Sequence, residues 1–302
     1  MGNLLVTGGS GFLGAHLTIR SRHKHDVVAT YFNNRIGVPG VTWKPIDLSD
    51  SAATQDFIFE IQPDFIINCA AETNVDRCEE NHELAYRLNR DAAANVAMAA
   101  KDVGAKLIHI STDAVFDGSR GGYREEDTPA PINVYGKSKL EGERAVLEIF
   151  PAALILRTNF FGLAIGHKKG LAAWFLENLE AERTCGGFSD VLISPVLVDE
   201  LANLVLGLVS SNAQGVFHAG GIDCLSKLDF GRRLARCFGL NPDLIIPASV
   251  AEAGLPALRP QKICLDSSKL MNLEYWRPTR IDEALKVLRE QYIPGILQYR
   301  VG

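Results

Sequence analysis

Tyr135 and Lys139 are the two residues whose types and spacing best fit acid–base chemistry. They stand four positions apart in a stretch of helical periodicity, so they share one face of a helix. A phenol has a pKa near ~10, which a nearby ammonium or a bound cationic nicotinamide would lower. The pair could therefore exchange a proton with a substrate oxygen while hydride moves at carbon. The strand predicted before this helix ends near Ser111 and Thr112, and a hydroxyl there could hold the substrate oxygen beside Tyr135.

A glycine-rich segment, Val-Thr-Gly-Gly-Ser-Gly-Phe-Leu-Gly over residues 6–14, follows the first expected strand and opens the first expected helix. Gly8 permits a tight turn, Gly11 lets the backbone approach a pyrophosphate, and Gly14 lets helix and strand pack closely. The helix N-terminus then offers free N–H groups and a positive dipole end to an anion. Strand, glycines and helix in this order predict a dinucleotide site.

The choice between NADP(H) and NAD(H) depends on the end of the second expected strand, Ala29-Thr30-Tyr31-Phe32-Asn33-Asn34-Arg35. An acidic residue there would bind the ribose 2′-hydroxyl of NAD and repel a 2′-phosphate. None is present, and Arg35 could pair with a phosphate. NADP(H) is therefore favoured, with NAD(H) as the alternative if Arg35 is a loop charge without a partner.

The first half of the chain alternates short apolar runs with longer stretches of helical periodicity. This alternation predicts a parallel sheet covered by helices on both faces, the doubly wound α/β fold of Rossmann type. The expected strands are residues 3–7, 26–31, 41–45, 65–68, 106–111 and 154–157, and the expected helices are residues 11–21, 52–61, 85–103 and 134–149.

The pattern becomes less regular after about residue 162. Helices are expected over 171–182, 198–210, 226–238 and 281–290, and strands over 191–194 and 216–219. These elements predict a smaller, interrupted C-terminal α/β domain. We expect an NAD(P)-binding Rossmann domain of residues 1–161 plus about 191–218, and a substrate-binding domain of about 162–190 and 219–302.

Composition and charge argue against several classes of function. The 302 residues are 47% hydrophobic and 22% charged with a net charge of -5, so no basic field favours nucleic acid. No apolar run reaches the ~20 residues of a membrane span, and the first residues lack a signal peptide's charged segment, so a cytoplasmic protein is expected. The histidines lack metal-binding spacing, and no metal is expected. Reduced, mostly buried thiols are expected, because no Cys-x-x-Cys pair occurs among Cys69, Cys78, Cys185, Cys224, Cys237 and Cys264.

These motifs together resemble the extended short-chain dehydrogenases/reductases over essentially the whole chain. Within that family the chain is most similar to the dTDP-4-dehydrorhamnose reductase branch. The resemblance is carried by residues 7–14, 47–48, 68–76, 89, 111–118, 135–139, 156–158 and 259–260.

The resemblance implies roles for the matching positions. Thr112, Tyr135 and Lys139 would be catalytic, with Tyr135 as the acid/base, Lys139 on the nicotinamide ribose and Ser111 as the less favoured hydroxyl partner. Besides Tyr135 and Lys139, the cofactor would contact Gly8, Gly11, Phe12, Leu13, Gly14, Asp47, Leu48, Ala70, Ala71, Thr73 and Asn89, the last of which could also be only a strut. The substrate would contact Asn74, Asp113, Asn159 and Arg259, where Arg259 either pairs with a diphosphate or forms a structural ion pair.

The chain also departs from the branch. Ala114 stands where these reductases carry Tyr, which puts the original sugar in doubt. It also lacks the carboxylate that dehydratases of the superfamily use at this place, so 4,6-dehydration is not expected. Residues 123–131 further resemble the non-catalytic regulatory β subunit of methionine adenosyltransferase, and their acidic trio, residues 125–127, is expected to be a solvated loop.

The expected function is an NADPH-dependent reductase of a keto group on a nucleotide-linked 4-keto-6-deoxy sugar, with Tyr135 as general acid. Two alternatives stay open: a nucleotide-sugar epimerase that holds NAD tightly, and a non-catalytic NADP-binding regulatory subunit. No nucleic-acid or membrane partner is expected. A homodimer through helices 85–103 and 134–149 follows from the resemblance alone.

Overall fold

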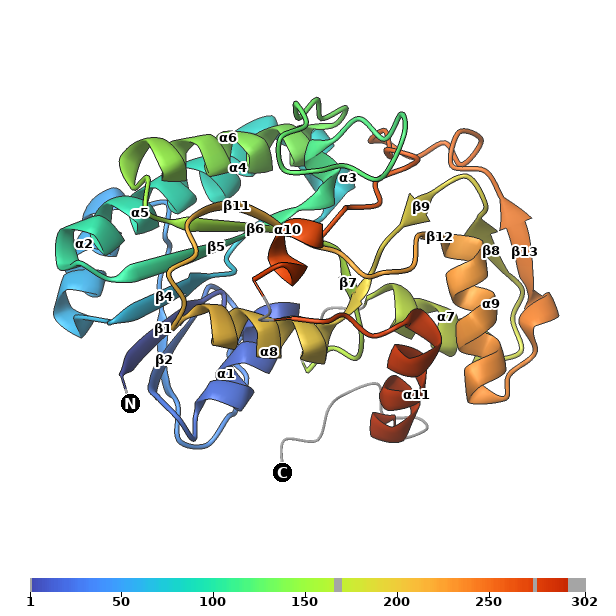
Figure 1. Ribbon diagram of the computed structural model, residues 1–302, viewed down its shortest axis with the longest axis horizontal. Helices are drawn as coiled ribbons and strands as arrows, with labels where there is room; N and C mark the ends of the chain where they lie inside the picture. Colours follow the sequence, from blue (N-terminus) through green and yellow to red (C-terminus); the bar gives the residue numbers. More distant parts are fainter. Residues whose placement is uncertain (1, 166–169, 274–275, 293–302) are drawn as a thin grey trace.

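Seven parallel strands form the central sheet of the computed structural model, which describes residues 2–165, 170–273 and 276–292 (Figure 1). Their order across the sheet is β11-β6-β5-β4-β1-β2-β3. This is the predicted doubly wound parallel sheet. The strands are β1 (Asn3–Thr7), β2 (Asp26–Tyr31), β3 (Thr42–Pro45), β4 (Phe65–Asn68), β5 (Lys106–Thr112), β6 (Leu154–Thr158) and β11 (Gly215–Ala219).

The sheet reverses its direction of growth at β1. From β1 the chain builds outward through β2 and β3, and then crosses to β4 on the other side of β1. Thr7 pairs with Asn68 at the ends of β1 and β4, and Asn68 pairs with His109 on β5. In sheets of this kind the crevice at the carboxyl ends of the strands, where the order reverses, is where ligands bind.

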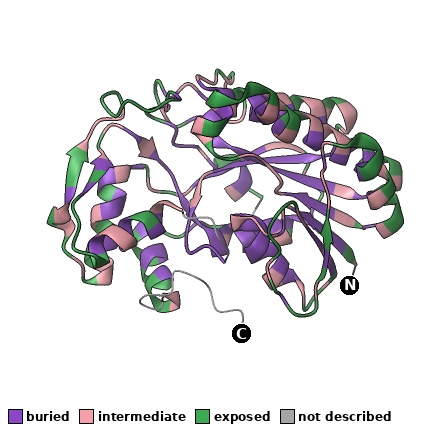
Figure 2. Ribbon diagram, turned by 180° about the vertical axis from the view of Figure 1, so that it is seen from behind, coloured by how far each residue is buried: buried purple, intermediate pink, exposed green. Residues whose placement is uncertain are grey.

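Helices cover both faces of the sheet. The helices α2 (Ser51–Ile61), α5 (Ala92–Val103) and α6 (Val134–Ile149) lie on one face, and α1 (Phe12–Ser21) and α8 (Val198–Leu208) lie on the other (Figure 1). In β1, Leu4 and Val6 face α1 and α8, whereas Leu5 faces α2 and α5. Strands buried on both sides account for the continuous apolar runs in the sequence. Figure 2 shows the resulting buried layer between the exposed outer sides of the helices.

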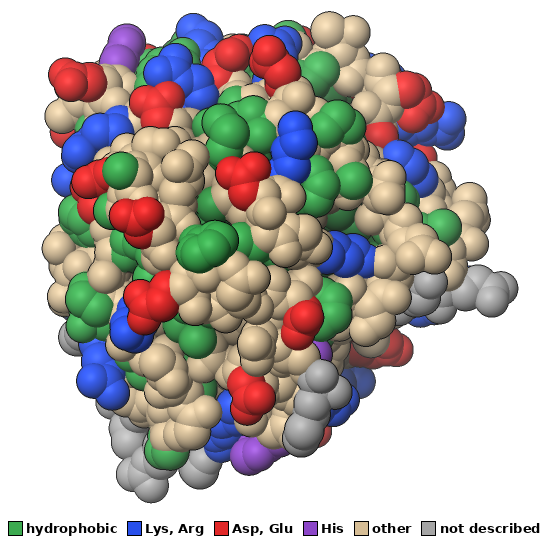
Figure 3. Space-filling model, turned by 90° about the vertical axis from the view of Figure 1, so that its left-hand side faces the viewer, with side chains coloured by type: hydrophobic (Ala, Val, Ile, Leu, Met, Phe, Trp, Pro, Cys, Tyr) green, Lys and Arg blue, Asp and Glu red, His purple; other side chains and the backbone are tan. Residues whose placement is uncertain are grey.

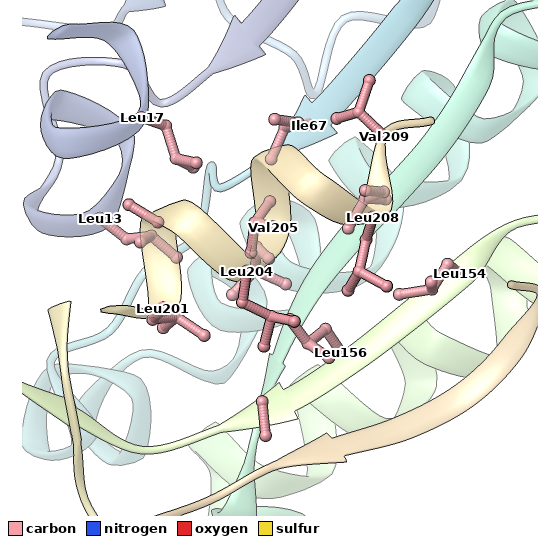
Figure 4. Packing of buried hydrophobic residues seen from close by; sticks show 14 of the residues in the cluster. Leu13, Leu17, Ile67, Leu154, Leu156, Leu201, Leu204, Val205, Leu208 and Val209 are labelled. Carbon is pink, nitrogen blue, oxygen red and sulfur yellow. The ribbon is translucent and has the colours of Figure 1, made fainter. Parts of the chain in front are cut away.

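The apolar side of α8 forms much of the core beneath α1. Leu201, Leu204, Val205 and Leu208 point from α8 toward α1 and the sheet, where they meet side chains of α1, β4 and β6 (Figure 4). All four are essentially inaccessible to solvent. Removing one such leucine typically costs about 2 to 5 kcal/mol of stability.

The connection between β4 and β5 differs from the single helix predicted over residues 85–103. It contains α3 (Val75–Glu80), α4 (His82–Tyr86), a π-helical turn over Arg87–Asp91 and then α5. The π turn packs directly on α6, since a Cβ at Gly142 would lie 2.2 Å from the carbonyl oxygen of Asn89. Periodicity cannot reveal such a widened turn, because the chain continues as helix on both sides of it.

The C-terminal part has its own apolar core around Phe175, Phe230 and Leu285. Its helices are α7 (Leu171–Glu180), α9 (Lys227–Phe238) and α11 (Ile281–Gln291), with a short 3-10 turn at Pro242–Leu244. The short helix α10 (Ser268–Met271) packs on β11 and adds Leu270 to the core of the main sheet, and a second 3-10 turn, Asp113–Val115, follows β5. Two-stranded sheets pair β7 (Phe160–Phe161) with β10 (Val196–Leu197), β9 (Leu192–Ile193) with β12 (Leu225–Ser226), and β8 (Cys185–Phe188) with β13 (Ile245–Ala248).

The chain enters this second part after β6 and returns to the main sheet before leaving it again. β9 still belongs to the C-terminal part, because it pairs with β12. The chain then returns through β10 to α8, which packs beside α1, and to β11, which pairs with β6 in the main sheet. The domain boundaries given above stay a prediction. Their ranges include residues 1, 166–169, 274–275 and 293–302, which lie outside the described residues.

The prediction that all cysteines are reduced is wrong for one pair. Cys224 and Cys264 form a disulfide, with Cα atoms 5.7 Å apart and a separation of 40 positions in the sequence. Their irregular spacing gave no signal, because the fold brings the segment before α9 beside the segment before α10. The thiols of Cys69, Cys78, Cys185 and Cys237 are free.

The distribution of charged side chains on the surface agrees with the small net charge of the sequence. On the face shown in Figure 3, acidic and basic side chains are interspersed with apolar ones, and neither sign gathers into a large patch. Within the described part of the chain, no helix is long and apolar enough to cross a membrane. Among the same residues, no group of three or more His, Cys, Asp or Glu side chains could hold a metal ion.

Candidate active site

A cavity of about 400 Å³ lies at the carboxyl ends of the sheet strands, between the main sheet and the C-terminal part. It is lined by the start of α1, the segments after β4 and β5, the start of α6, the end of β6, and C-terminal segments around Lys227 and Arg259. The structure brings together at this cavity the predicted residues Gly11, Phe12, Leu13, Gly14, Ala71, Thr73, Thr112, Asp113, Tyr135, Lys139, Asn159 and Arg259.

The glycine segment after β1 has the close packing that a phosphate cradle requires. Gly8 adopts φ 62°, and a Cβ there would lie 2.8 Å from the backbone nitrogen of Ala70. A Cβ at Gly14 would lie 2.2 Å from the carbonyl oxygen of Gly8, so α1 starts directly against the turn. No described side chain caps the start of α1 at Gly11. The N-terminal N–H groups of α1 therefore suit a dinucleotide pyrophosphate.

Tyr135 is positioned by the close contact between α6 and the segment after β5. Asn133 caps α6 by accepting from the Gly136 N–H at 2.8 Å. A Cβ at Gly136 would lie 2.2 Å from the carbonyl oxygen of Ala114, so only glycine lets the two backbones approach this closely. The contact places the Tyr135 hydroxyl in hydrogen-bonding reach of the Thr112 side chain.

The protein's own groups keep Tyr135 in its neutral form. Burial raises the pKa of Tyr135 above its usual value, and although the hydrogen bond to Thr112 opposes this, the charge of Asp113 adds to it. From the sequence, Lys139 was expected to lower the pKa of Tyr135. Instead, the cost of removing a phenolate from water outweighs any help from the neighbouring amine. A neutral phenol is a proton donor.

Lys139 is almost fully buried one helical turn after Tyr135. Its Nζ donates to the carbonyl oxygen of Ile110 at 2.8 Å and lies 3.4 Å from Nε2 of His109. Burial lowers the pKa of Lys139 to about 8, against the opposing charge of Glu143. Its proton is therefore held less firmly than that of an exposed lysine.

The resemblance favours Thr112 over Ser111 as the hydroxyl partner, and the two side chains have different contacts. Thr112 donates to Asp113 Oδ1 at 3.1 Å and accepts from the Ala114 N–H at 3.2 Å. Ser111 instead donates to Glu143, which is held in a buried ion pair by Arg157 at 2.6 Å. Ser111 is thereby committed to a structural contact.

Asp113 and Asn159 form a polar pair on the wall of the cavity. The Asn159 amide donates to Asp113 Oδ2 at 2.6 Å. Burial raises the pKa of Asp113 to about 6, although the bonds from Asn159 and Thr112 and the charge of Lys227 favour its ionised form. Asp113 offers carboxylate oxygens and Asn159 offers an amide oxygen and N–H groups, which suit sugar hydroxyls.

Two cations line the same cavity from the C-terminal part. Arg259 pairs with Asp76 at 2.8 Å and donates to the carbonyl oxygen of Ala257 at 2.8 Å. The structural ion pair considered for Arg259 is therefore present, and the residue lines the cavity as well. Lys227 opens α9, and its burial lowers the pKa of its amine.

Sequence reasoning missed part of the lining. Lys227 is the clearest case, because in the sequence it is only the first residue of a helix capped by Ser226. Only the fold brings this position beside Asp113. The other lining residues that were not predicted are Cys69, Val75, Ile110, Ala114, Asn133, Thr158, Phe160, Val191, Ile193, Pro260 and Ile263.

Several predicted residues do not line the cavity. Arg35 is exposed in the segment after β2, while Asp47 and Leu48 follow β3 at the same edge of the sheet. Asp47 accepts from Ser49 and lies 3.8 Å from Arg87. These positions lie on the β2 and β3 side of β1, where the adenine half of the cofactor was predicted to bind. Gly8, in the glycine turn, packs against the backbone of Ala70.

Asn74 and Asn89 have structural partners instead. Asn74 caps α3 by accepting from the Arg77 N–H at 3.1 Å. Asn89 is buried, accepts from the Glu72 N–H at 2.8 Å, and donates to the Glu72 carbonyl oxygen and to Ser138. These contacts fit the strut that was considered as the alternative role of Asn89.

The acidic trio of residues 125–127 lies outside the cavity, but it is not fully solvated as expected. Glu125 is half-buried and accepts from the His218 N–H at 2.8 Å. Burial raises the pKa of Glu125. Of the three, Glu125 therefore fastens the loop to β11.

A comparison with models of known protein families shows which family the chain belongs to. The model of the "RmlD substrate binding domain" matches residues 2–293. The chain belongs to this family. Homologues in the family are NAD(P)-dependent reductases of the extended short-chain dehydrogenase/reductase type, which confirms the predicted family and enzyme class.

Individual relatives agree over nearly the whole length. The chain is 35% identical over 286 residues to dTDP-4-dehydrorhamnose reductase of Mycobacterium tuberculosis, covering 91% of this chain and 90% of the relative. It is 34% identical over 290 residues to methionine adenosyltransferase 2 subunit beta of Pongo abelii, covering 89% and 82%. Both resemblances noted in the sequence are thereby confirmed.

A solved structure shows the same fold with a cofactor. Bacillus anthracis dTDP-4-dehydrorhamnose reductase in complex with NADP superposes with a TM-score of 0.86 at 28% identity, covering 96% of this chain and 99% of that one. Seven parallel strands with small C-terminal sheets therefore follow the architecture of this family.

Proposed function

We propose that this chain is an NADPH-dependent reductase of a keto group on a nucleotide-linked 4-keto-6-deoxy sugar. The observation that carries the proposal is the placement of Thr112, Tyr135 and Lys139 on one cavity that also reaches the glycine segment of α1. Bound NADPH would supply the hydride in this reaction.

Tyr135 is the proposed proton donor. Its raised pKa keeps the phenol protonated through the neutral range, which is the form that can protonate an alkoxide as it develops. Thr112 orients the phenol, because its side chain reaches Tyr135 while its own proton is given to Asp113. Lys139 would hold the nicotinamide ribose.

The C-terminal cations suit the far end of such a substrate. Lys227 and Arg259 line the cavity from the C-terminal part, and a diphosphate is the anionic group that a nucleotide-linked sugar brings. Asp113 and Asn159 lie next to Lys227 and would bind sugar hydroxyls. Ala114 leaves out the tyrosine of the reductase branch, so the sugar can differ from that of the relatives.

NADP(H) is the proposed cofactor, with NAD(H) as the alternative. Arg35 is exposed in the segment after β2, where it would meet an adenosine ribose bound along the strand ends. The replacement Arg35→Glu should raise KM for NADPH far more than KM for NADH, since it exchanges an attractive charge for a repulsive one. An equal rise in KM for both cofactors would contradict the assignment of NADP(H).

The second candidate is a non-catalytic, NADP-binding regulatory subunit. It is favoured by the 34% identity to methionine adenosyltransferase 2 subunit beta. Co-purification with a larger enzyme and no turnover would support it. A nucleotide-sugar epimerase is the remaining alternative, and NAD retained through gel filtration would support that reading. A cytoplasmic location and a homodimer through α5 and α6 are part of the proposal, and light scattering tests the dimer.

The deciding experiment follows NADPH oxidation against a panel of nucleotide-linked 4-keto sugars. The wild-type chain should turn over at least one of them, and Tyr135→Phe should lose about 10²- to 10⁴-fold in kcat/KM while still binding NADPH. The matched control is Tyr86→Phe, which changes a tyrosine packed in the same apolar cluster but outside the cavity lining. Tight NADPH binding without turnover of any sugar contradicts the proposal.

A further inference from the structure

A row of buried polar side chains crosses the sheet and ends at Lys139. Thr7 on β1, Asn68 on β4 and His109 on β5 occupy paired positions on neighbouring strands, so their side chains share one face of the sheet. The Thr7 hydroxyl donates to Asn68 Oδ1 at 2.6 Å, and Asn68 Nδ2 lies 3.1 Å from His109 Nδ1. His109 Nε2 lies 3.4 Å from Lys139 Nζ. Thr7 and His109 are completely buried.

A backbone group fixes the orientation of the Asn68 amide. The Ala70 N–H donates to Asn68 Oδ1 at 3.2 Å, and a backbone nitrogen can only donate. Oδ1 must therefore face Ala70 and Thr7, and Nδ2 must face His109. Turning the amide over would set two N–H groups against each other at Ala70.

This orientation determines the tautomer of His109. The Asn68 NH₂ group has only protons to offer, so Nδ1 of His109 must be the acceptor and carries no proton. A neutral imidazole then carries its single proton on Nε2. Burial keeps the ring neutral, because it lowers the pKa of His109 well below its usual value, and the charge of Lys139 acts in the same direction.

The Nε2–H of His109 then points at Lys139. An ammonium has no lone pair to accept this proton, whereas a neutral amine has one. We propose that Thr7, Asn68 and His109 form a positioning relay that presents an N–H donor to Lys139 and thereby favours the neutral amine over the ammonium.

The other groups that face Lys139 do not reverse this effect. The thiol of Cys69 follows β4, Tyr135 lies one turn earlier on α6, and the carboxylate of Glu143 lies one turn later. Glu143 favours the ammonium, but its charge is shared with Arg157 of β6 in the ion pair at 2.6 Å. The relay thus makes Lys139 a group that exchanges its proton near neutral pH. Its use in the reaction rests on the proposed function, whereas the relay itself does not.

The test is a spectroscopic measurement that needs neither cofactor nor substrate. Protein with ¹⁵N-labelled histidine and ¹³C-labelled lysine is titrated across the neutral range, and the signals are assigned with His109→Gln and Lys139→Met. We expect His109 to show a protonated Nε2 and an unprotonated Nδ1 throughout, and the Lys139 signal to titrate near its lowered pKa of about 8. A proton on Nδ1 in the wild type overturns the relay, whether or not the chain is a reductase.

The replacement Asn68→Asp tests the cause. A carboxylate still accepts from Thr7 and Ala70, but it now accepts from His109 as well, so the proton should move to Nδ1 and Nε2 should become an acceptor for the Lys139 ammonium. The Lys139 midpoint should rise by about one pH unit or more.

The matched control is Asn89→Asp. It also adds a buried carboxylate near α6, but the hydrogen bonds of Asn89 go to Glu72 and Ser138 and not to His109. It should leave the tautomer unchanged and raise the Lys139 midpoint less. The same rise in both variants, with the tautomer unchanged in both, would show a charge effect alone and would overturn the relay. If Asn68→Asp does not fold, the wild-type tautomer decides.

Discussion

Asp113 is the residue whose titration we expect to be visible in activity. Burial raises its pKa to about 6. The ionised carboxylate accepts from both Asn159 and Thr112, and these bonds hold the Thr112 side chain in place beside the phenol of Tyr135. We therefore expect kcat/KM to rise with pH through about 6. In Asp113→Asn this acidic limb should vanish, and kcat/KM should fall at every pH. Asp117→Asn, which changes a carboxylate outside the cavity, should retain the limb, and a limb that persists in Asp113→Asn contradicts the assignment.

At the same scale, residues that are neighbours in sequence could be predicted and those that meet across the fold could not. The spacing of Tyr135 and Lys139 fixes their common helix face, so their place on one cavity followed directly. Lys227 has no such signal, because about ninety residues separate it from Lys139. The pKa of Tyr135 was misjudged for a related reason: the sequence shows the nearby amine but not the burial, and burial dominates.

Among the helices, α6 offers a sharp test of how an element positions the site. Gly136→Ala would place a Cβ 2.2 Å from the Ala114 carbonyl oxygen, so α6 must move away from Thr112. We expect a loss of about 1 to 3 kcal/mol in the free energy of unfolding and a lower kcat, since Tyr135 moves with the helix. The control is Gly207→Ala in α8, where a Cβ meets nothing within 4 Å. That variant should gain up to about 1 kcal/mol by helix propensity, and equal thermal shifts in both variants would contradict the argument.

Elements of the main sheet were predictable because burial on both faces leaves a continuous apolar run in each strand. The pair β8 and β13 was not predicted. Cys185–Phe188 contains two glycines and Ile245–Ala248 contains a proline, which are compositions typical of loops. Two-stranded parallel pairing tolerates them here, because each strand has a free edge and packs on α9.

At the scale of the whole molecule, one cluster of ion pairs links helix α1 to helix α8. Asp199 binds His16 at 2.9 Å and Arg20 at 2.5 Å, and its side chain is nearly buried. Although burial opposes it, these partners lower the pKa of Asp199 from 3.8 to about 2. The ionised carboxylate therefore contributes about 2 kcal/mol above pH ~4, which is lost as the pH falls through ~2.

The corresponding variant is Asp199→Asn. It should lose about 3 kcal/mol of stability at neutral pH, because buried His16 and partly buried Arg20 lose the carboxylate that binds them. Its unfolding free energy should also fall less steeply than that of the wild type below pH ~4. Asp282→Asn, which breaks the exposed pair with Arg233, should change stability by less than about 1 kcal/mol. Urea unfolding at several pH values measures all three, and parallel pH curves for wild type and Asp199→Asn would contradict the assignment.

The disulfide links two distant parts of the cavity wall. Cys224 lies three residues before Lys227, and Cys264 follows Ile263, which lines the cavity with Arg259. Because the bridge closes a loop of 40 residues, its removal should cost about 2 to 4 kcal/mol. The loosened segments carry the proposed diphosphate cations. Cys224→Ser should therefore raise KM for the sugar substrate more than KM for NADPH, whereas Cys237→Ser, which removes a free thiol, should change neither.

Thiol counting tests the bridge without any assumption about function. In denaturant without reductant, four thiols should react, those of Cys69, Cys78, Cys185 and Cys237, and all six should react after reduction. Cys224→Ser should release one additional thiol, at Cys264, and so raise the unreduced count from four to five while removing one cysteine from the chain. Six reactive thiols in the unreduced wild type would mean that the two segments are held only by their hydrogen bonds, such as the one from the Gly220 N–H to the Ser267 hydroxyl oxygen at 2.7 Å. The stability and KM effects of Cys224→Ser should then disappear together.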